Sequence, residues 1–463
     1  MVENKLYYLF VLSGSLIFLI CLVVFNKPAF FKLIQLTVRQ LDVILNKNIS
    51  EKTKNRSLLK NSGQLLAWLF INTLYFAIAL LAGSLPVLLY MQLFRGAETD
   101  FSSPLFFVSM LMPVLLFLIP RRKRSDYSYW SKLLHHIVLD NPATGRYLLR
   151  QELKRRTKAT NQNFIIVSGL ARAGTTAMLN LLFASGAFKS IRYSNMPFLL
   201  APVLWRRLYR PKSLKKKERA HKDSLSVDKD SPEAFEEYYF KASLQDAYID
   251  QNHLKKHQLS PEMHKEYLQY QSLFGEENKV YLAKNNNFIL RYESLRQQNK
   301  DFKLIIMFRE PLQHAHSLLR QHRHFTNLQK KDPFVLTYMN WLGHHEFGLN
   351  HKTFSLEGME NPYPTDSLNH WLTKWINYYT YILQFSKDPG LYFVSNLSLR
   401  KYPEKVLHKL SESIGIDITS SITEHGSGTD NTDISASDPS LQAKAEQIYQ
   451  TLLKHELLQT QRE

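Results

Sequence analysis

The chain has 463 residues, a formal net charge of +19 and a single cysteine, Cys21. Its length exceeds one ordinary domain, and a lone cysteine excludes a disulfide within the chain. The positive charge could indicate a nucleic-acid-binding protein, but much of it lies beside apolar runs and in residues 205–222, which favours attraction to anionic lipid or a polyanionic acceptor over nucleic acid.

Three uncharged apolar runs occupy the first 120 residues, at 6–25, 64–91 and 104–120. The first two are long enough to cross a hydrocarbon core about 30 Å thick, whereas the third needs a thinner bilayer or flanking residues. Any of them could instead be a buried core helix, and the first could be a signal peptide. Because Asn26, Lys27 and Pro28 follow the first run where a cleavage site would stand, we expect a retained span. Residues 1–120 are thus predicted to form a membrane domain with three spans.

Basic residues set the expected orientation. Residues 27–60 carry eight of them: Lys27, Lys32, Arg39, Lys47, Lys52, Lys54, Arg56 and Lys60. The connection from 92 to 103 has only Arg95, and the third run ends at a basic cluster, residues 121–124. Because basic segments stay in the cytoplasm, we expect a multi-pass protein of the inner (cytoplasmic) membrane with everything after residue 120 in the cytoplasm.

Residues 121–160 are polar and helix-like, and predict a juxtamembrane connector. Its His135–His136 pair lacks partners at metal-ligand spacing and is expected to face solvent. From 161 to 463, short apolar runs at 163–168, 280–283, 303–308 and 391–395 alternate with helical patterns. This alternation predicts a P-loop-like α/β domain, a parallel sheet with helices on both faces. Residues 419–438 are expected to form an exposed loop before a final helix.

The first motif, GLARAGTT at Gly169–Thr176, lies where the first of these strands turns into a helix. Glycines, inward-facing amides and the helix N-terminus make such a turn a phosphate-binding loop. A Walker A sequence requires lysine after the second glycine, but Thr175 stands there and Arg172 supplies the cation. The change argues against a nucleotide hydrolase or kinase, and for transfer of a less charged group from a phosphosulfate. A glycine turn without function is the alternative.

The second motif, KLIIMFREPLQHAHSLLRQH, spans residues 303–322. Arg309 closes a strand and Ser317 lies eight residues later in the following helix. An arginine at the carboxyl end of a strand faces the crevice in which α/β sheets bind ligands. Guanidinium and hydroxyl groups there can share one phosphate. Taken alone the pattern is weak, because Arg-Glu-Pro before a helix is also ordinary capping chemistry.

Together the two motifs resemble the PAPS-dependent sulfotransferase family, in which a PRSGTT-like loop holds the 5'-phosphosulfate of 3'-phosphoadenosine 5'-phosphosulfate (PAPS). In that family an Arg, with a Ser eight residues on, holds the 3'-phosphate. Ala171 and Ala173 depart from the loop's proline and serine. The resemblance looks closest to a bacterial branch and covers about residues 160–415. It implies PAPS as donor, no metal, and these donor-binding residues: Arg172, Ala173, Gly174, Thr175, Thr176, Arg309 and Ser317.

The resemblance also implies a catalytic lysine near the transferred group, and Lys284 at the end of the YLAK run fits it. Charge on the leaving oxygen could be neutralised there. The general base is an acidic residue in related enzymes, but the nearest position here is Asn195, which cannot accept the proton. Glu233 and His221 are therefore the candidates, although surface or capping roles fit both equally. His344 and His345 are expected to serve packing or sugar stacking, not metal binding.

Three functional classes follow from the sequence: a sulfotransferase, a P-loop kinase or NTPase, and a catalytically dead membrane scaffold. A kinase needs a Walker lysine and an acidic Mg²⁺ ligand, and neither is seen. A dead scaffold should have lost Arg172, Arg309 or Ser317, yet all three remain. We therefore expect a PAPS-dependent sulfotransferase. Its place beside membrane lipid favours a membrane-proximal hydroxyl acceptor, such as a glycan or glycolipid.

Overall fold

A computed structural model describes the chain at residues 2–46, 48–94, 103–118, 129–155, 161–209, 217–218, 226–227, 231–356, 358–418 and 437–459. The chain divides into two compact units, Met1–Thr144 and Gly145–Glu463. Each unit has its own packing and is described by itself.

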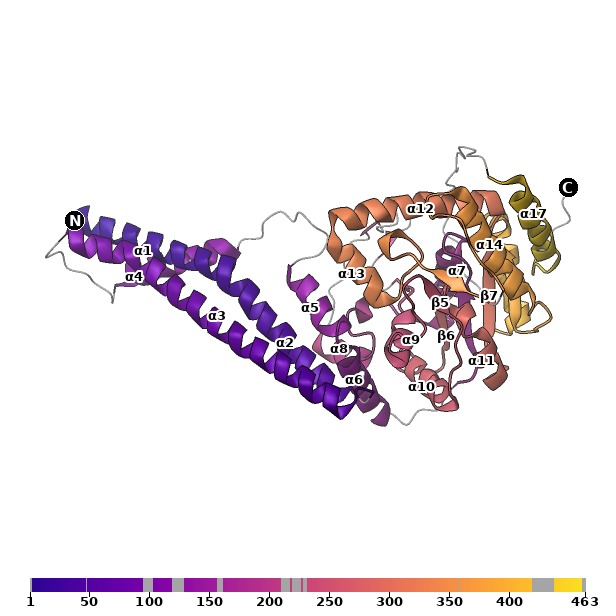
Figure 1. Ribbon diagram of the computed structural model, residues 1–463, viewed down its shortest axis with the longest axis horizontal. Coiled ribbons are helices and arrows are strands. Elements are labelled where there is room, and N and C mark those ends of the chain that lie inside the picture. Colours follow the sequence, from indigo (N-terminus) through magenta and orange to yellow (C-terminus); the bar gives the residue numbers. More distant parts are fainter. Residues whose placement is uncertain are drawn as a thin grey trace. The chain divides into compact units, whose positions relative to one another are not determined.

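Unit 1 is built on a long antiparallel helical pair (Figure 1). Helix α1 (Val2–Cys21), the π-helical segment η1 (Leu22–Asn26) and α2 (Lys27–Leu45) follow one another without a break. The chain then turns back into α3 (Glu51–Leu93). Two shorter helices, α4 (Pro104–Leu118) and α5 (Tyr129–Leu139), complete the unit, and α6 (Pro142–Lys154) crosses its boundary.

Small and amide side chains let the two arms of this helical pair approach closely. A Cβ added at Gly14 would collide with the carbonyl oxygen of Gly83, so the backbones of α1 and α3 touch at this crossing. Further along, Asn26 Nδ2 donates to the carbonyl oxygen of Asn72 at 2.9 Å. Glycine crossings and interhelical amide bonds are the contacts that hold helices together in lipid, where apolar burial supplies no driving force.

Most apolar side chains of these arms face outwards. The stretches Leu6–Leu45 and Glu51–Leu93 are long and apolar enough to cross a membrane. In the most apolar 18 residues of each stretch, only 11% and 6% are buried. A core helix of a soluble protein would be mostly buried. Helix α4 has 15 residues, short of the roughly 20 that a span needs, so a third span stays a prediction. The loop expected between the first two runs is largely helical, because α2 and the start of α3 occupy it.

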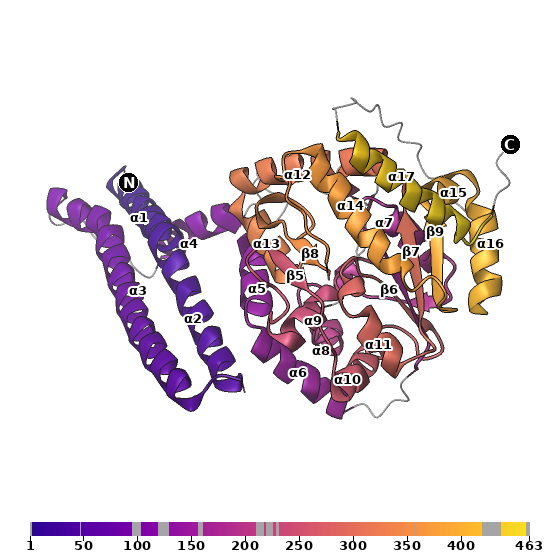
Figure 2. The ribbon, with the colours of Figure 1, turned by 45° about the vertical axis from the view of Figure 1, so that its right-hand side comes forward.

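The core of unit 2 is a five-stranded parallel sheet of order β2-β6-β1-β7-β9. Figure 2 labels strands β6, β7 and β9 of this sheet. Its strands, given in chain order, are β1 (Phe164–Ser168), β2 (Phe188–Lys189), β6 (Val280–Lys284), β7 (Lys303–Phe308) and β9 (Leu391–Ser395). In register, Ile166 of β1 lies beside Ala283 of β6 and Leu304 of β7. The predicted parallel α/β sheet is confirmed, and all four apolar runs are strands.

Helices and short elements fill the connections. The helices are α7 (Thr175–Ala184), α8 (Pro202–Leu208), α9 (Glu237–Leu244), α10 (Pro261–Gln271), α11 (Tyr292–Gln298), α12 (Pro311–Lys331), α13 (Pro333–Leu342), α14 (Leu368–Leu383), α15 (Asn396–Lys401), α16 (Pro403–Ile414) and α17 (Pro439–Lys454). The one-turn 3-10 segments are η2 (Tyr193–Asn195), η3 (Phe288–Leu290) and η4 (Gly348–Asn350). Two small pairings are β3 (Lys217–Glu218) with β4 (Ser226–Val227), and β5 (His253–Lys255) with β8 (Thr353–Ser355).

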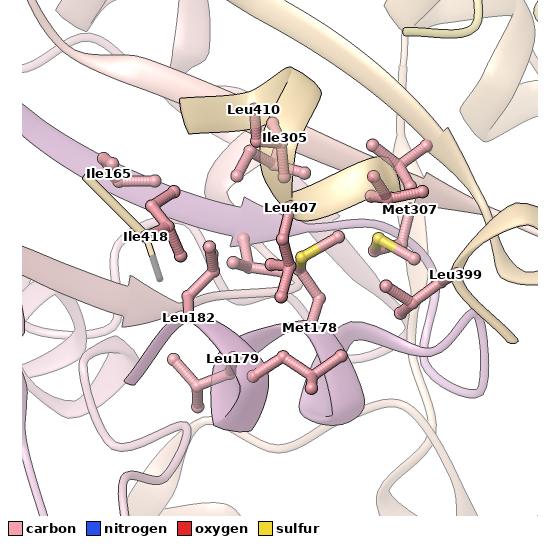
Figure 3. Close-up of a cluster of buried hydrophobic side chains, with 14 of the residues drawn as sticks. Ile165, Met178, Leu179, Leu182, Ile305, Met307, Leu399, Leu407, Leu410 and Ile418 are labelled. Atoms are coloured by element: carbon pink, nitrogen blue, oxygen red, sulfur yellow. The ribbon is translucent and has the colours of Figure 1, made fainter. Parts of the chain in front are cut away.

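Alternate residues of each strand enter different layers. Ile165 of β1 and Ile305 of β7 join a buried cluster with Met178 and Leu182 of α7 and Leu407 of α16 (Figure 3). On the opposite face, Phe164 packs against Tyr267 of α10, and Phe308 packs against Tyr449 of α17. Burial on both faces explains why these strands are continuous apolar runs.

Candidate active site

The carboxyl ends of four neighbouring strands bring polar residues to one edge of the sheet. Lys284 ends β6, the GLARAGTT loop follows β1, Arg309 follows β7 and Asn396 follows β9. Because all these strands are parallel, residues far apart in sequence meet at this edge. This is the edge at which both sequence motifs were expected.

The loop after β1 adopts a conformation that depends on its glycines. Gly169, Arg172 and Gly174 have positive φ angles of 138°, 73° and 100°. A Cβ at Gly169 would lie 2.5 Å from the carbonyl oxygen of Met307, and one at Gly174 would lie 2.6 Å from Nδ2 of Asn396. No side chain of the described residues caps α7 at Gly174. The first-turn amides of α7 are therefore not taken by a side-chain cap, as anion binding requires.

The two motifs meet in space. Arg172 Nε donates to Ser317 Oγ at 3.4 Å, and the ring of His314, one turn earlier on α12, bonds the carbonyl oxygen of Ala171 at 2.8 Å through Nε2. Burial above all, together with the positive charges of Arg309 and Arg172, lowers the pKa of His314 to about 3, against the opposing effect of the bond to Ala171. A neutral His314 thus supports the loop while two arginines make its surroundings electropositive.

Lys284 and Glu233 lie beside the first turn of α7. Lys284 Nζ donates to Thr176 Oγ1 at 2.8 Å and stands 3.8 Å from Glu233 Oε1. The buried Glu233 carboxylate accepts the Tyr193 hydroxyl at 3.0 Å and the backbone N–H of Ala234 at 2.9 Å. Lys284 and Glu233, one of the candidate bases, are therefore neighbours of the loop after β1.

The other residues considered as bases are placed differently. His221 lies outside the described residues. Asn195 accepts the backbone N–H of Arg192 at 2.8 Å through Oδ1 and so closes a local turn. Its amide therefore has a structural role in η2.

A second carboxylate lies near Lys284 and was not found from the sequence. Glu346 accepts Asn286 Nδ2 at 3.1 Å, and its other oxygen is 3.5 Å from Nδ1 of His344. Burial alone would raise the pKa of Glu346, but His344 lowers it below its usual range, with help from Lys284. Burial would likewise lower the pKa of His344, yet Glu346 raises it. His344 is thus oriented by a carboxylate, a role different from the packing or stacking expected.

Its neighbour His345 is buried and bonds the carbonyl oxygen of Asn350 through Nδ1 at 3.0 Å, which is a packing role. Over the described part of the chain, no group of three or more histidine, cysteine, aspartate or glutamate side chains is arranged to hold a metal ion. His345 thus supports the local fold, whereas His344 and Glu346 lie near Lys284.

Buried charges fix the acidic segment of Glu233 against β6. Glu236 accepts hydrogen bonds from the hydroxyls of Tyr267 and Tyr281 and from Asn285 Nδ2. Glu237 forms a two-bond ion pair with the fully buried guanidinium of Arg291, at 2.7 and 2.8 Å. Buried charges are tolerated when they are paired and fully bonded. Glu236 and Glu237 thus position the chain that carries Glu233.

Comparisons with known proteins add little to this geometry. No protein-family model matches the chain, and neither does any curated protein. The crystal structure of sulfotransferase STF1 from Mycobacterium tuberculosis H37Rv (type 1 form) is 14% identical, covers 68% of this chain and 78% of its own, and has a TM-score of 0.38. Sulfotransferase STF9 from Mycobacterium avium is 13% identical, covers 76% and 83%, and has a TM-score of 0.37. This likeness is too slight to assign a function.

Proposed function

We propose that the chain transfers a sulfuryl group from PAPS to a hydroxyl of a membrane-proximal glycan or glycolipid. One observation carries the proposal. The two motifs that resemble donor-binding elements of sulfotransferases come together, with Arg172 of the loop 3.4 Å from Ser317 of α12. Next to them stand a lysine and a carboxylate, Lys284 and Glu233.

The donor roles follow from the loop and from β7. The amides of Gly174, Thr175 and Thr176 open α7 and can bond the 5'-phosphosulfate, with Arg172 as the charged partner. Arg309 and Ser317 bind the 3'-phosphate, because a guanidinium and a hydroxyl suit one phosphate. Two arginines close enough to lower the pKa of His314 are what a doubly phosphorylated donor would need.

The transfer itself needs a proton acceptor and a stabiliser of the leaving group. Glu233 takes the proton of the acceptor hydroxyl as the new oxygen–sulfur bond forms. Lys284, which bonds Thr176, faces the phosphate oxygen from which the sulfuryl group departs and neutralises its negative charge. His344, which is oriented by Glu346, is the alternative candidate for the base.

Binding calorimetry tests the donor. The purified protein should bind the 3',5'-bisphosphate product more tightly than ATP, because only the bisphosphate offers a 3'-phosphate. Arg309→Ala should weaken bisphosphate binding by about 1.5–3 kcal/mol, the usual contribution of a charged hydrogen bond. Arg323→Ala is the matched control, since Arg323 is exposed on the same helix as Ser317 and contacts the carbonyl oxygen of Asp366. ATP binding as tight as that of the bisphosphate would reject the donor assignment.

The apolar arms of unit 1 support a membrane location, because each contains a long apolar stretch whose side chains are mostly unburied. We propose that the catalytic unit lies on the cytoplasmic side of a bacterial inner membrane, because residues 27–60 and 121–124 are basic and basic segments stay in the cytoplasm. PAPS is made in that compartment, so supply and orientation agree.

Reporter fusion tests this orientation. A reporter fused after Glu463 should behave as cytoplasmic, and a cysteine replacing Thr99 should react with an impermeant thiol reagent added from outside. Cys21 lies within the first apolar stretch and serves as the internal control for lack of labelling. An externally active C-terminal reporter would mean that the predicted number of spans is wrong by one, and the third apolar run would be the first to re-examine.

A further inference from the structure

A cavity of about 450 Å³ lies in unit 2 between the short strand β8, the segment after it, and one face of α14. Its polar lining residues are His253, Thr353, Ser355, Glu360, Asn361, Lys374, Asn377 and Tyr378, of which Lys374 is buried and Glu360 is exposed. The volume is that of an ordinary small-molecule site. Amide and hydroxyl groups arranged around one cation suit a ligand that carries several hydroxyls and one negative charge.

The cation is Lys374, whose side chain is almost completely buried, with 6% exposed. Its Nζ donates one long hydrogen bond, 3.4 Å, to the carbonyl oxygen of Lys352. Within the part of the chain that the structure describes, no carboxylate forms an ion pair with it. The rings of Phe354 and Trp371 lie 5.5 and 5.4 Å from the ammonium nitrogen. A buried ammonium group normally has an anionic partner at ion-pair distance. Among the described residues, Glu346 acts on the charge of Lys374 but forms no ion pair with it, so a direct anionic partner would have to come from a ligand.

The surroundings of Lys374 are electropositive. Its charge lowers the pKa values of three neighbouring histidines, His322, His351 and His370, on top of the effect of burial. Burial lowers the pKa of Lys374 itself to about 7, although Glu346 opposes this. A negatively charged ligand would relieve this balance, since it favours the protonated forms of all four groups.

The cavity adjoins the phosphate loop. Tyr378, on its wall, lies with its hydroxyl 3.3 Å from Ser168 Oγ at the end of β1. Lys374 and Phe354 also line a second, smaller hollow together with Ala171 of the loop and with Asn286 and Glu346. The same lysine therefore faces the cavity on one side and the loop residues on the other.

We propose that this cavity binds an acidic sugar, with Lys374 as the partner of its carboxylate and the amide and hydroxyl groups of β8 and α14 as partners of its hydroxyls. That the sugar belongs to the acceptor rests on the proposed function, because the cavity adjoins the loop assigned to the donor. The binding itself does not depend on that function.

Titration of the full-length protein with glucuronic acid and with glucose tests the proposal, since the two sugars differ in the carboxylate. Calorimetry at pH 6.5 measures affinity, and the fluorescence of Trp371, which lies beside Lys374, is a second readout. Glucuronate should bind about ten- to one-hundred-fold more tightly than glucose, the ratio that one charged hydrogen bond supports. Lys374→Met, which keeps the length of the side chain without the charge, should abolish this preference.

Two further variants keep the test sharp. Lys255→Met on the neighbouring strand β5 is the matched control, because this lysine is 51% exposed and pairs with Asp250; it should leave the preference unchanged. Ser355→Trp at an exposed position of the cavity wall should block both sugars without a buried change. An unchanged preference in Lys374→Met would overturn the proposal, and so would inorganic sulfate binding as tightly as glucuronate, since the latter result would assign a free-anion site.

The 3',5'-bisphosphate is titrated on the same preparation. Its displacement of glucuronate from one shared site would also overturn the proposal, because the cavity would then be part of the donor site. If the bisphosphate fails to bind while glucuronate binds as expected, the proposed function fails and the cavity assignment stands. The two failures are therefore distinguishable.

Discussion

The proposed donor side and the proposed acceptor side of the site are built in different ways. The proposed donor side comes from two continuous motifs. Residues 169–176 are the turn after β1 and the start of α7, and residues 303–322 include β7, a turn and the first part of α12. The acceptor side comes from separate segments that contribute one or two residues each, among them Glu233, Lys284, His344 and Lys374. The proposed donor-binding residues are brought together by local geometry, whereas the proposed acceptor-binding residues are brought together only by the packed fold.

This difference follows from the chemistry of the two ligands. A phosphate is recognised by amides and a helix N-terminus, which one short segment can supply. Transfer to an acceptor hydroxyl needs a base and a charge stabiliser at fixed distances from the reacting atoms, and here two separate segments provide them. The donor side should therefore depend on a few residues strongly, and the acceptor side on several residues that act together.

Replacing Arg172 by Ala should have the largest effect. Transfer from PAPS should fall by about 100- to 1,000-fold, because a charged contact to the transferred group is lost. The melting temperature should stay close to that of the wild type, since Arg172 is a half-buried loop residue. Arg400→Ala, an exposed arginine on α15, is the control and should retain activity. Activity equal to wild type in Arg172→Ala would remove the donor site from this loop.

Lys284 and Glu233 should act as a pair on the acceptor side. Lys284→Met and Glu233→Gln should each lower kcat by about 100-fold, the usual range for acid–base catalysis. The double variant should lose far less than the product, because their side chains are 3.8 Å apart and share one reaction step. Lys279→Met, at an exposed ion pair just before β6, is the control.

His344→Asn, compared with Glu233→Gln, tests whether Glu233 or His344 is the base. With Glu233 as base, Glu233→Gln should be the more damaging change, and the loss of the acid limb of the kcat–pH profile should follow that variant. A larger loss in His344→Asn, with the pH profile altered there instead, would contradict the assignment and make the His344–Glu346 pair the base.

Acid stability should show the smallest effect, and it lies on the donor side. The folded pKa of His314 is about 3, below the unfolded value of about 6.5. The unfolded state therefore binds more protons below pH 6.5, so the stability contribution is complete above that pH and is lost as pH falls towards 3. Between pH 7 and 5 this costs about 2 kcal/mol. His314→Gln keeps a donor for Ala171 and should reduce the acid-induced drop in melting temperature; an equal drop would contradict the depressed pKa.

Much of the fold could be predicted because its signals are local. Four apolar runs predicted the parallel strands, since strands buried on both faces are continuous apolar runs that can be recognised without knowledge of their partners. The glycine turn at 169–174 and the helix after it were also predicted, because glycine readily adopts the positive φ angles that Gly169 and Gly174 have. The helical nature of residues 27–45 and 51–63 was missed, because polar and basic side chains there masked the continuation of the two apolar helices.

The sequence by itself thus determined the sheet, the phosphate loop and the apolar arms, all properties of continuous segments. Only the tertiary structure decided that Arg172 reaches Ser317, that Glu233 stands beside Lys284, and that His344 has a carboxylate partner. It also revealed the buried Lys374 and its cavity. The reason is physical: burial, and the distance between residues far apart in the chain such as Arg172 and Ser317, are set by packing, about which the pattern of one segment carries no information.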